Sequence, residues 1–96
     1  MNHYQTIAFA NKLYYENMKT FKDLVFEPHP SGHGVQSRIS FKNGHGLSVV
    51  KGHIFIGDND LFEMAELFND ELVSGTSIME VTEEQITEKL IELQEL

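Results

Sequence analysis

Cysteine is absent from the 96 residues of the chain. This absence excludes disulfide bonds, thiolate metal sites and cysteine nucleophiles, and it fits a reducing cytosol. No apolar run approaches the ~18 residues that a membrane-spanning helix needs. The N-terminal residues also lack the basic start and the continuous apolar region of a signal peptide. The sequence therefore predicts a cytoplasmic protein without a membrane partner.

Basic residues are scarce in the second half of the chain. Residues 1–57 carry six lysines and arginines and three acids, whereas residues 58–96 carry twelve acids and a single lysine, Lys89. An acidic half repels nucleic-acid phosphates and anionic membranes, and it attracts basic protein surfaces. Two interpretations stay open: the acids only increase solubility, or they form a binding surface.

The composition is that of one packed domain, since 41% of the residues are hydrophobic and seven are phenylalanine. Residues 1–18 carry apolar side chains at three- and four-residue spacing, which predicts an N-terminal helix. Residues 81–96 predict a C-terminal helix, because Thr82 and Gln85 form a capping box before an apolar stripe. Residues 19–80 are expected to form an antiparallel sheet.

A hairpin is the clearest feature of the central region. Residues 35–41 alternate between apolar and polar side chains, and residues 47–50 supply the returning strand. Asn43-Gly44 tolerates positive φ at both positions and predicts a two-residue type I′ turn. A hairpin centred on this turn pairs residue 39 with residue 48.

Two other segments complete the expected sheet. Residues 21–27 are rich in aromatic and branched side chains and predict a strand. Residues 61–68 fit a helix or a strand; as a strand they would form a second hairpin with residues 71–73 through the turn at Asn69-Asp70. The predicted fold class is α+β: an antiparallel sheet of three to five strands with an N-terminal and a C-terminal helix.

Histidines next to glycines raise the question of a metal site. His45 lies at the tip of the predicted hairpin, whereas His29, His33 and His53 could meet at its open end and hold a divalent metal. The favoured interpretation is that histidine is tolerated at turns that glycine makes possible. We therefore predict no metal and no cofactor, and the three histidines remain the alternative.

Motifs of catalysis are missing from the chain. It contains no Gly-x-Ser-x-Gly elbow, no phosphate-binding loop and no complete calcium loop. No catalytic residue is predicted, and we expect a protein without enzymatic activity.

The acids of the second half could imitate the phosphates of a nucleic acid. Such a mimic would occupy the basic, nucleic-acid-binding surface of another protein and would not bind nucleic acid itself. The candidate contacts are Glu63, Glu66, Asp70, Glu71, Glu84 and Glu88. A second hypothesis is self-association into a homodimer through the aromatic helix at residues 1–18.

Several motifs together resemble a family of small phage-encoded proteins of unassigned function. The motifs are His-Pro-Ser-Gly-x-Gly at residues 29–34, Phe-Lys-Asn-Gly-His-Gly-Leu-Ser-Val-Val at 41–50, Phe-Glu-Met-Ala-Glu-Leu at 62–67 and Val-Thr-Glu-Glu at 81–84. The resemblance covers about residues 18–96 and favours a strand at residues 61–68. Two departures are His45, where the family has tyrosine, and a short loop after Lys51.

The resemblance implies a phage origin and no catalytic residues. Small acidic phage proteins often bind host proteins, including defence nucleases such as CRISPR effectors. Together with the charge distribution, this leads to the expectation of an inhibitor that acts in the host cytoplasm by covering a basic surface of a host protein.

Overall fold

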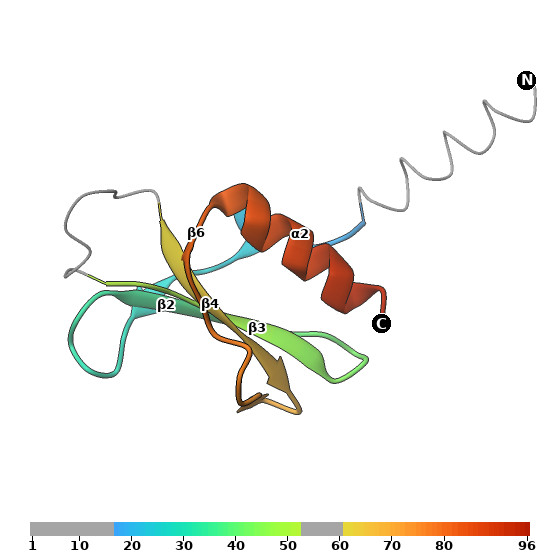
Figure 1. The fold of residues 1–96 in the computed structure, drawn as a ribbon, viewed down its shortest axis with the longest axis horizontal. Coiled ribbons are helices and arrows are strands. Elements are labelled where there is room, and N and C mark those ends of the chain that lie inside the picture. Colours follow the sequence, from blue (N-terminus) through green and yellow to red (C-terminus); the bar gives the residue numbers. More distant parts are fainter. Residues whose placement is uncertain (1–16, 53–60) are drawn as a thin grey trace, which may run out of the picture.

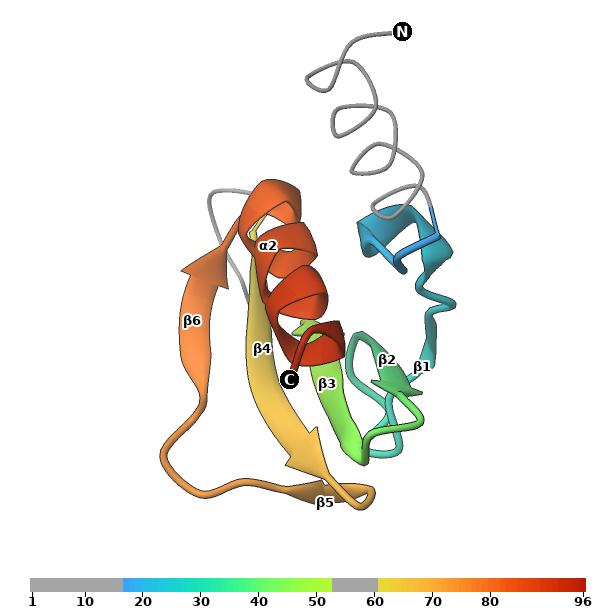
Figure 2. The ribbon, with the colours of Figure 1, turned by 90° about the vertical axis from the view of Figure 1, so that its right-hand side faces the viewer.

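One antiparallel sheet with a helix on one of its faces makes up most of the structure (Figure 1). The structure is a computed structural model that describes residues 17–52 and 61–96. Its elements in chain order are η1 (Phe21–Asp23), β1 (Glu27–Pro28), β2 (Val35–Ser40), β3 (His45–Lys51), β4 (Phe62–Phe68), β5 (Glu71–Leu72), β6 (Ile78–Val81) and α2 (Glu83–Gln94). The strand order is β1-β2-β3-β4-β5, and β6 pairs with the N-terminal end of β4 (Figure 2).

The first hairpin, β2 and β3, forms where the sequence predicts it, but its turn is of another type. Phe41 N–H donates to the carbonyl oxygen of His45 (2.8 Å), so three residues, 42–44, make the loop. Only Gly44 of these has a positive φ, 91°. A three-residue loop of this kind is a type I turn followed by a left-handed residue.

The longer loop shifts the register by one residue. Ile39 pairs with Leu47 rather than with residue 48. Because neighbouring residues of a strand point to opposite faces, this shift decides that Leu47 and Val49 share a face with Ser37 and Ile39. The predicted type I′ turn and register were wrong for this reason.

The second hairpin, β4 and β5, confirms the strand alternative for residues 61–68. Phe68 pairs with Glu71, and the two residues between them, Asn69 and Asp70, have φ values of 51° and 68°. This is the type I′ geometry that the sequence suggested for Asn43-Gly44. Among residues other than glycine, asparagine and aspartate adopt this positive-φ conformation most readily.

Strand β6 was not predicted. It pairs Ile78 with Met64 and Val81 with Phe62, so three steps along β6 oppose two steps along β4, which is a β-bulge. Glu80 within this bulge has a φ of 58°. The irregular step removes the apolar alternation by which a strand is recognised in a sequence.

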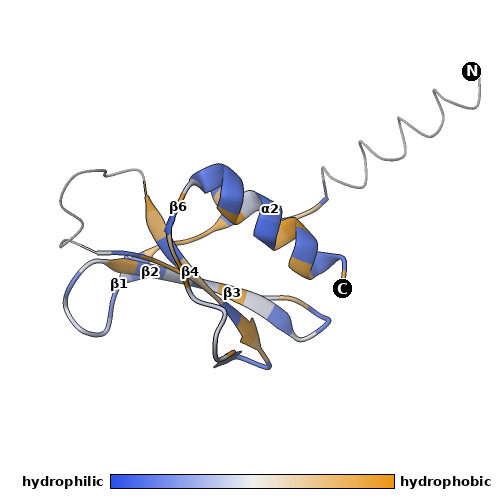
Figure 3. Ribbon diagram, viewed as in Figure 1, coloured by the Kyte–Doolittle hydropathy of each residue, from blue (hydrophilic) through white to orange (hydrophobic). Residues whose placement is uncertain are grey.

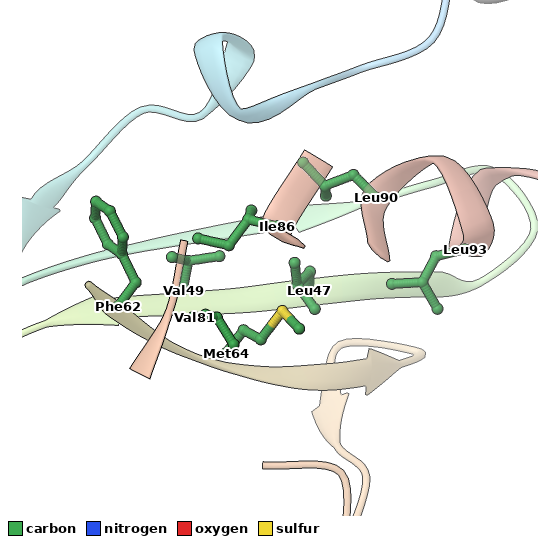
Figure 4. Packing of buried hydrophobic residues seen from close by; sticks show 8 residues of the cluster. All are labelled: Leu47, Val49, Phe62, Met64, Val81, Ile86, Leu90 and Leu93. Carbon is green, nitrogen blue, oxygen red and sulfur yellow. The ribbon is translucent and has the colours of Figure 1, made fainter. Parts of the chain in front are cut away.

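Helix α2 covers one face of the sheet and completes the core. Thr82 Oγ1 accepts from Gln85 N–H (3.2 Å), and Gln85 Oε1 accepts from Thr82 N–H (2.8 Å), which confirms the predicted capping box. The fully buried apolar cluster joins three residues of the helix to the sheet (Figure 4). Its members are Leu47, Val49, Phe62, Met64, Val81, Ile86, Leu90 and Leu93.

The segment before β1 lies against α2. Gln94 is bound to the backbone of Lys19 in both directions: its Oε1 accepts from Lys19 N–H (2.8 Å) and its Nε2 donates to the Lys19 carbonyl (2.9 Å). Phe21 N–H donates to Thr87 Oγ1 (3.1 Å). The rings of Phe21 and Phe26 then pack on Phe62 at the edge of the core.

The predicted architecture of three to five strands between two helices was wrong. The sheet has six strands, and the described residues contain one α-helix, the C-terminal one, with a 3-10 turn at Phe21–Asp23. That turn replaces the first three residues of the strand expected at residues 21–27, and only Glu27 of this segment lies in a strand. The expected N-terminal helix falls mainly on residues 1–16, outside the described residues, and Asn17 and Met18 at its end form a turn and a bend.

Candidate functional site

The outward side of α2 carries a row of carboxylates. Ile86, Leu90 and Leu93 point into the core, so residues on the other side of the helix face solvent. Four glutamates occupy that side and are exposed, and we call them the acidic face of α2: Glu84, Glu88, Glu92 and Glu95. In Figure 3 the helix is mostly hydrophilic, with hydrophobic segments between the hydrophilic ones.

A hollow of about 460 Å³ lies between the first two turns of α2 and the segment around η1. Glu83, Glu84 and Glu88 line it on the helix side, and Lys22 lines it on the side of η1. Lys22 forms no ion pair with any residue of the described ranges, so the carboxylates are near a cation without being paired to it. The structure thus brings together two of the six predicted contact residues.

The other four candidates are dispersed over the sheet. Glu63 faces away from α2 and accepts from Ser77 Oγ (3.0 Å), whereas Glu66 faces α2. Asp70 lies in the turn before β5 and accepts from Ser40 Oγ (2.6 Å). Glu71 is exposed at the sheet edge. Glu63, Asp70 and Glu71 therefore do not form one surface with the acidic face, and Glu66 is joined to it only through Lys89.

Lys89 links the helix to the sheet. Its Nζ lies 2.8 Å from Glu92 Oε2 and 3.6 Å from Glu66 Oε2. The hydrogen bond with Glu92, followed by the charges of Glu92 and Glu66, raises the pKa of the Lys89 ammonium above its ordinary value although partial burial acts in the opposite direction. Lys89 therefore pairs with Glu92 of the acidic face, whereas Glu84 and Glu88 form no ion pair with a residue of the described ranges.

The structure describes two of the three histidines of the metal-binding alternative. His29 and His33 both line a second hollow, of about 350 Å³, next to Gly52 at the open end of the first hairpin. His29 Nδ1 accepts from Ser31 N–H (3.1 Å) and lies 2.8 Å from Ser31 Oγ. His53 lies outside the described residues, and within the described ranges no three histidines and carboxylates converge on a metal position.

A groove on the sheet face opposite α2 was missed by the sequence reasoning. It encloses about 620 Å³ and is lined by strand residues such as Gln36, Arg38 and Ser48, by His29 and Pro30, and by the segment 72–77. The polar half of the alternation in β2 was visible in the sequence. The walls were not, because they come from a loop and from an irregular segment far away in the chain.

The groove is closed at one end by a contact between the two hairpins. Arg38 Nη2 donates to the Asp70 carbonyl (2.7 Å), and Ser40 donates to the Asp70 carboxylate. Since β3 and β4 lie between β2 and β5 in the sheet, this contact requires the sheet to curl strongly around its open face. The curl converts a flat face into a concave one.

Comparison of the chain with protein-family models, with characterised proteins and with solved structures returns no match. The resemblance to small phage proteins therefore stays a prediction from the sequence motifs. Among the described residues, no helix has the length and apolar character needed to cross a membrane.

Proposed function

We propose that this chain is a non-enzymatic binding protein whose acidic face on α2 covers a basic, nucleic-acid-binding surface of another protein. The observation that carries the proposal is the hollow between α2 and η1, where Glu84 and Glu88 form no ion pair with a residue of the described ranges. A lysine or arginine of the partner would enter this hollow and pair with both carboxylates. The phage origin and a defence nuclease as the target rest on the sequence resemblance alone.

The fixed position of the carboxylates supports the proposal. Helix α2 is held by its capping box, by the buried Ile86 and Leu90 and by the hydrogen bond between Phe21 and Thr87. A rigid helix presents carboxylates at a spacing set by its geometry, and less side-chain ordering is needed on binding. Charges at the rim of an interface mainly increase the association rate.

Opposite changes in the association rate are expected when the carboxylates of the hollow and when Lys22 are replaced. The double substitution Glu84→Gln/Glu88→Gln removes two of the three carboxylates that line the hollow, and Lys22→Gln removes the cation beside them. Capture from a lysate of the host cell identifies the bound protein, and surface plasmon resonance then measures its binding. We expect the double variant to associate on the order of tenfold more slowly and Lys22→Gln to associate faster than the wild type.

The matched control is Glu71→Gln/Glu80→Gln, which removes two exposed carboxylates from β5 and β6 and changes the net charge equally. We expect it to bind nearly as the wild type does. The wild-type complex should weaken between about 50 and 200 mM salt and be displaced by nucleic acid. Binding that is insensitive to salt, or lost equally in both double variants, would contradict the proposal.

A further inference from the structure

The open face of the sheet, which faces away from α2, carries three hydrogen-bond donors side by side. Arg38 on β2 is paired with Ser48 on β3, and Gln36 lies two residues before Arg38 on the same face. Directly paired residues have Cβ atoms about 4.5–5.5 Å apart, and residues i and i+2 of a strand are about 7 Å apart. The guanidinium, the hydroxyl and the amide can therefore reach one bound group.

These donors are not saturated by the protein. Ser48 is only 7% exposed, and neither its hydroxyl nor the Gln36 amide forms a hydrogen bond with a residue of the described ranges. Arg38 uses one N–H group on the Asp70 carbonyl and pairs with no described carboxylate. A guanidinium has five N–H groups in a plane, so this bond fixes its orientation while the other groups remain available.

The walls of the groove combine polar and apolar side chains. Leu72 and Val73 stand on one side, Pro30 on the other, and Val50 and Ala65 form the floor. Leu72 is 62% exposed and offers apolar surface to the groove. The volume of about 620 Å³ falls in the range of ~300–1,000 Å³ that is typical of small-molecule sites.

We propose that the groove is a binding site for a small organic carboxylate with an apolar body. The carboxylate would accept hydrogen bonds from Arg38, Ser48 and Gln36, because guanidinium and carboxylate groups match in geometry. The apolar body would lie between Leu72, Val73 and Pro30. Glu63 lies across β3 from Gln36, since both residues pair with Val50, and its carboxylate accepts from Ser77. Its negative charge would keep the ligand carboxylate at the Arg38 side of the groove.

This site is independent of the binding function proposed for the acidic face. It lies on the other side of the sheet from α2 and shares no residue with the hollow at η1. Loss of one activity would therefore leave the other unchanged.

The experiment is a titration of the ¹⁵N-labelled full chain with benzoate, followed by the amide signals and by the Arg38 Nε–H signal. Benzyl alcohol, which has the same ring without the charge, is the matched probe. We expect saturable shifts at Gln36, Arg38, Ser48 and Ala65 with benzoate and at least tenfold weaker binding of benzyl alcohol.

Three variants separate the contributions. Arg38→Gln removes the charge but keeps an amide donor for the Asp70 carbonyl, and it should raise the Kd for benzoate at least tenfold. Ala65→Leu fills the floor without changing any charge and should abolish binding. Lys42→Gln removes a charge from the loop of the same hairpin, outside the groove, and should leave the Kd within twofold.

Three results would overturn the proposal. The first is that the chemical shift changes do not saturate with benzoate or fall on residues outside the groove. The second is that benzyl alcohol and benzoate bind with equal Kd. The third is that Arg38→Gln and Lys42→Gln raise the Kd for benzoate equally. If Arg38→Gln alters the fold, which the amide spectrum reports, Ala65→Leu and the comparison of the two probes still decide.

Discussion

At the scale of single residues, Glu80 holds the least favourable backbone conformation for its type. Its φ of 58° lies in the left-handed region, where a residue with a Cβ is disfavoured by roughly 1 kcal/mol or more. The conformation is part of the bulge that lets β6 pair with β4 at both Ile78 and Val81. The bulge also interrupts the exposed edge of the sheet, which hinders edge-to-edge association.

The strain at Glu80 predicts that glycine is more stabilising than alanine at this position, which is the reverse of the usual order. Glu80→Gly should be more stable than Glu80→Ala by about 1 kcal/mol, because glycine adopts a positive φ without a clash. Met79, the exposed neighbour without a positive φ, is the control, and there alanine should be the more stable. Urea unfolding measures both pairs. Equal preferences at the two positions would contradict the assigned bulge.

At the scale of elements, the tip of the first hairpin caps the helix that covers it. Asn43 Nδ2 donates to the Leu93 carbonyl (2.8 Å) and to an oxygen of Leu96 (3.1 Å), while its Oδ1 accepts from His45 N–H (3.0 Å). Because the last carbonyls of a helix have no partner within the helix, this side chain satisfies groups that would otherwise need water. One asparagine therefore joins the turn, the sheet and α2.

The Asn43 contact gives a second prediction. Asn43→Asp keeps the acceptor for His45 N–H but places a negative charge at the negative end of α2, and it should lower the free energy of unfolding by about 2 kcal/mol at pH 7. Asn43→Ala, which loses the bonds without adding a charge, should lose about 1 kcal/mol. Protonation of the new carboxyl below about pH 4 should reduce the deficit of Asn43→Asp. A pH-independent deficit would exclude a role for the charge.

The bridge from α2 to β4 predicts a dependence on alkaline pH. Since the pKa of Lys89 is raised in the folded state, its contribution is fully present below the ordinary lysine pKa of 10.5 and is lost as pH rises through the folded-state pKa. Lys89→Met should therefore cost about 0.5–1 kcal/mol at pH 7, and the difference from the wild type should shrink above about pH 10.5. Chemical denaturation at pH 7, 9 and 11 measures it. A difference that persists at pH 11 would indicate packing rather than charge.

Elements with one dominant local cause could be predicted from the sequence. The capping box placed the start of α2, and alternation placed β2. For residues 61–68 the local pattern left helix and strand open, and the motif resemblance favoured the strand. The turn at Asn43-Gly44 was located but mistyped, since local sequence does not report that Asn43 is engaged with the end of α2. Strand β6 and the turn at η1 were missed because tertiary contacts with β4 and with Thr87 stabilise them.

At the scale of the whole molecule, the acidic balance was predictable, but the groove was not. Composition alone gives the charge of −8. The groove exists because Asp70 reaches back to Arg38 and Ser40 across two strands, and the curl of a sheet that permits this contact follows from packing. Four of the six contact residues chosen for their charge lie off the acidic face, since the sequence does not reveal which carboxylates bind within the protein.

The uneven charge predicts that salt stabilises the fold. Glu84, Glu88 and Glu92 succeed one another at four-residue spacing, and each such like-charge pair costs ~0.2–0.5 kcal/mol in an unscreened helix. Raising salt from about 10 to 150 mM shortens the Debye length from ~30 to ~8 Å, so the free energy of unfolding should increase by about 0.5–1 kcal/mol.

The same glutamates provide the control for the salt effect. Glu84→Gln/Glu88→Gln should be more stable than the wild type at low salt, and it should gain less from added salt. Urea unfolding at the two salt concentrations compares them. A loss of stability on adding salt would show that attractive pairs, such as those of Lys89, outweigh the repulsion.

The order of the core along the chain has a consequence for biosynthesis. The ribosome releases Leu47, Val49 and Met64 before Ile86, Leu90 and Leu93, which cover them. At ~5–20 residues per second, the nascent sheet keeps an apolar face uncovered for seconds while the helix is still being made. Rare codons between residues 68 and 93 would lengthen that interval and should increase the share of newly made protein that is captured by chaperones.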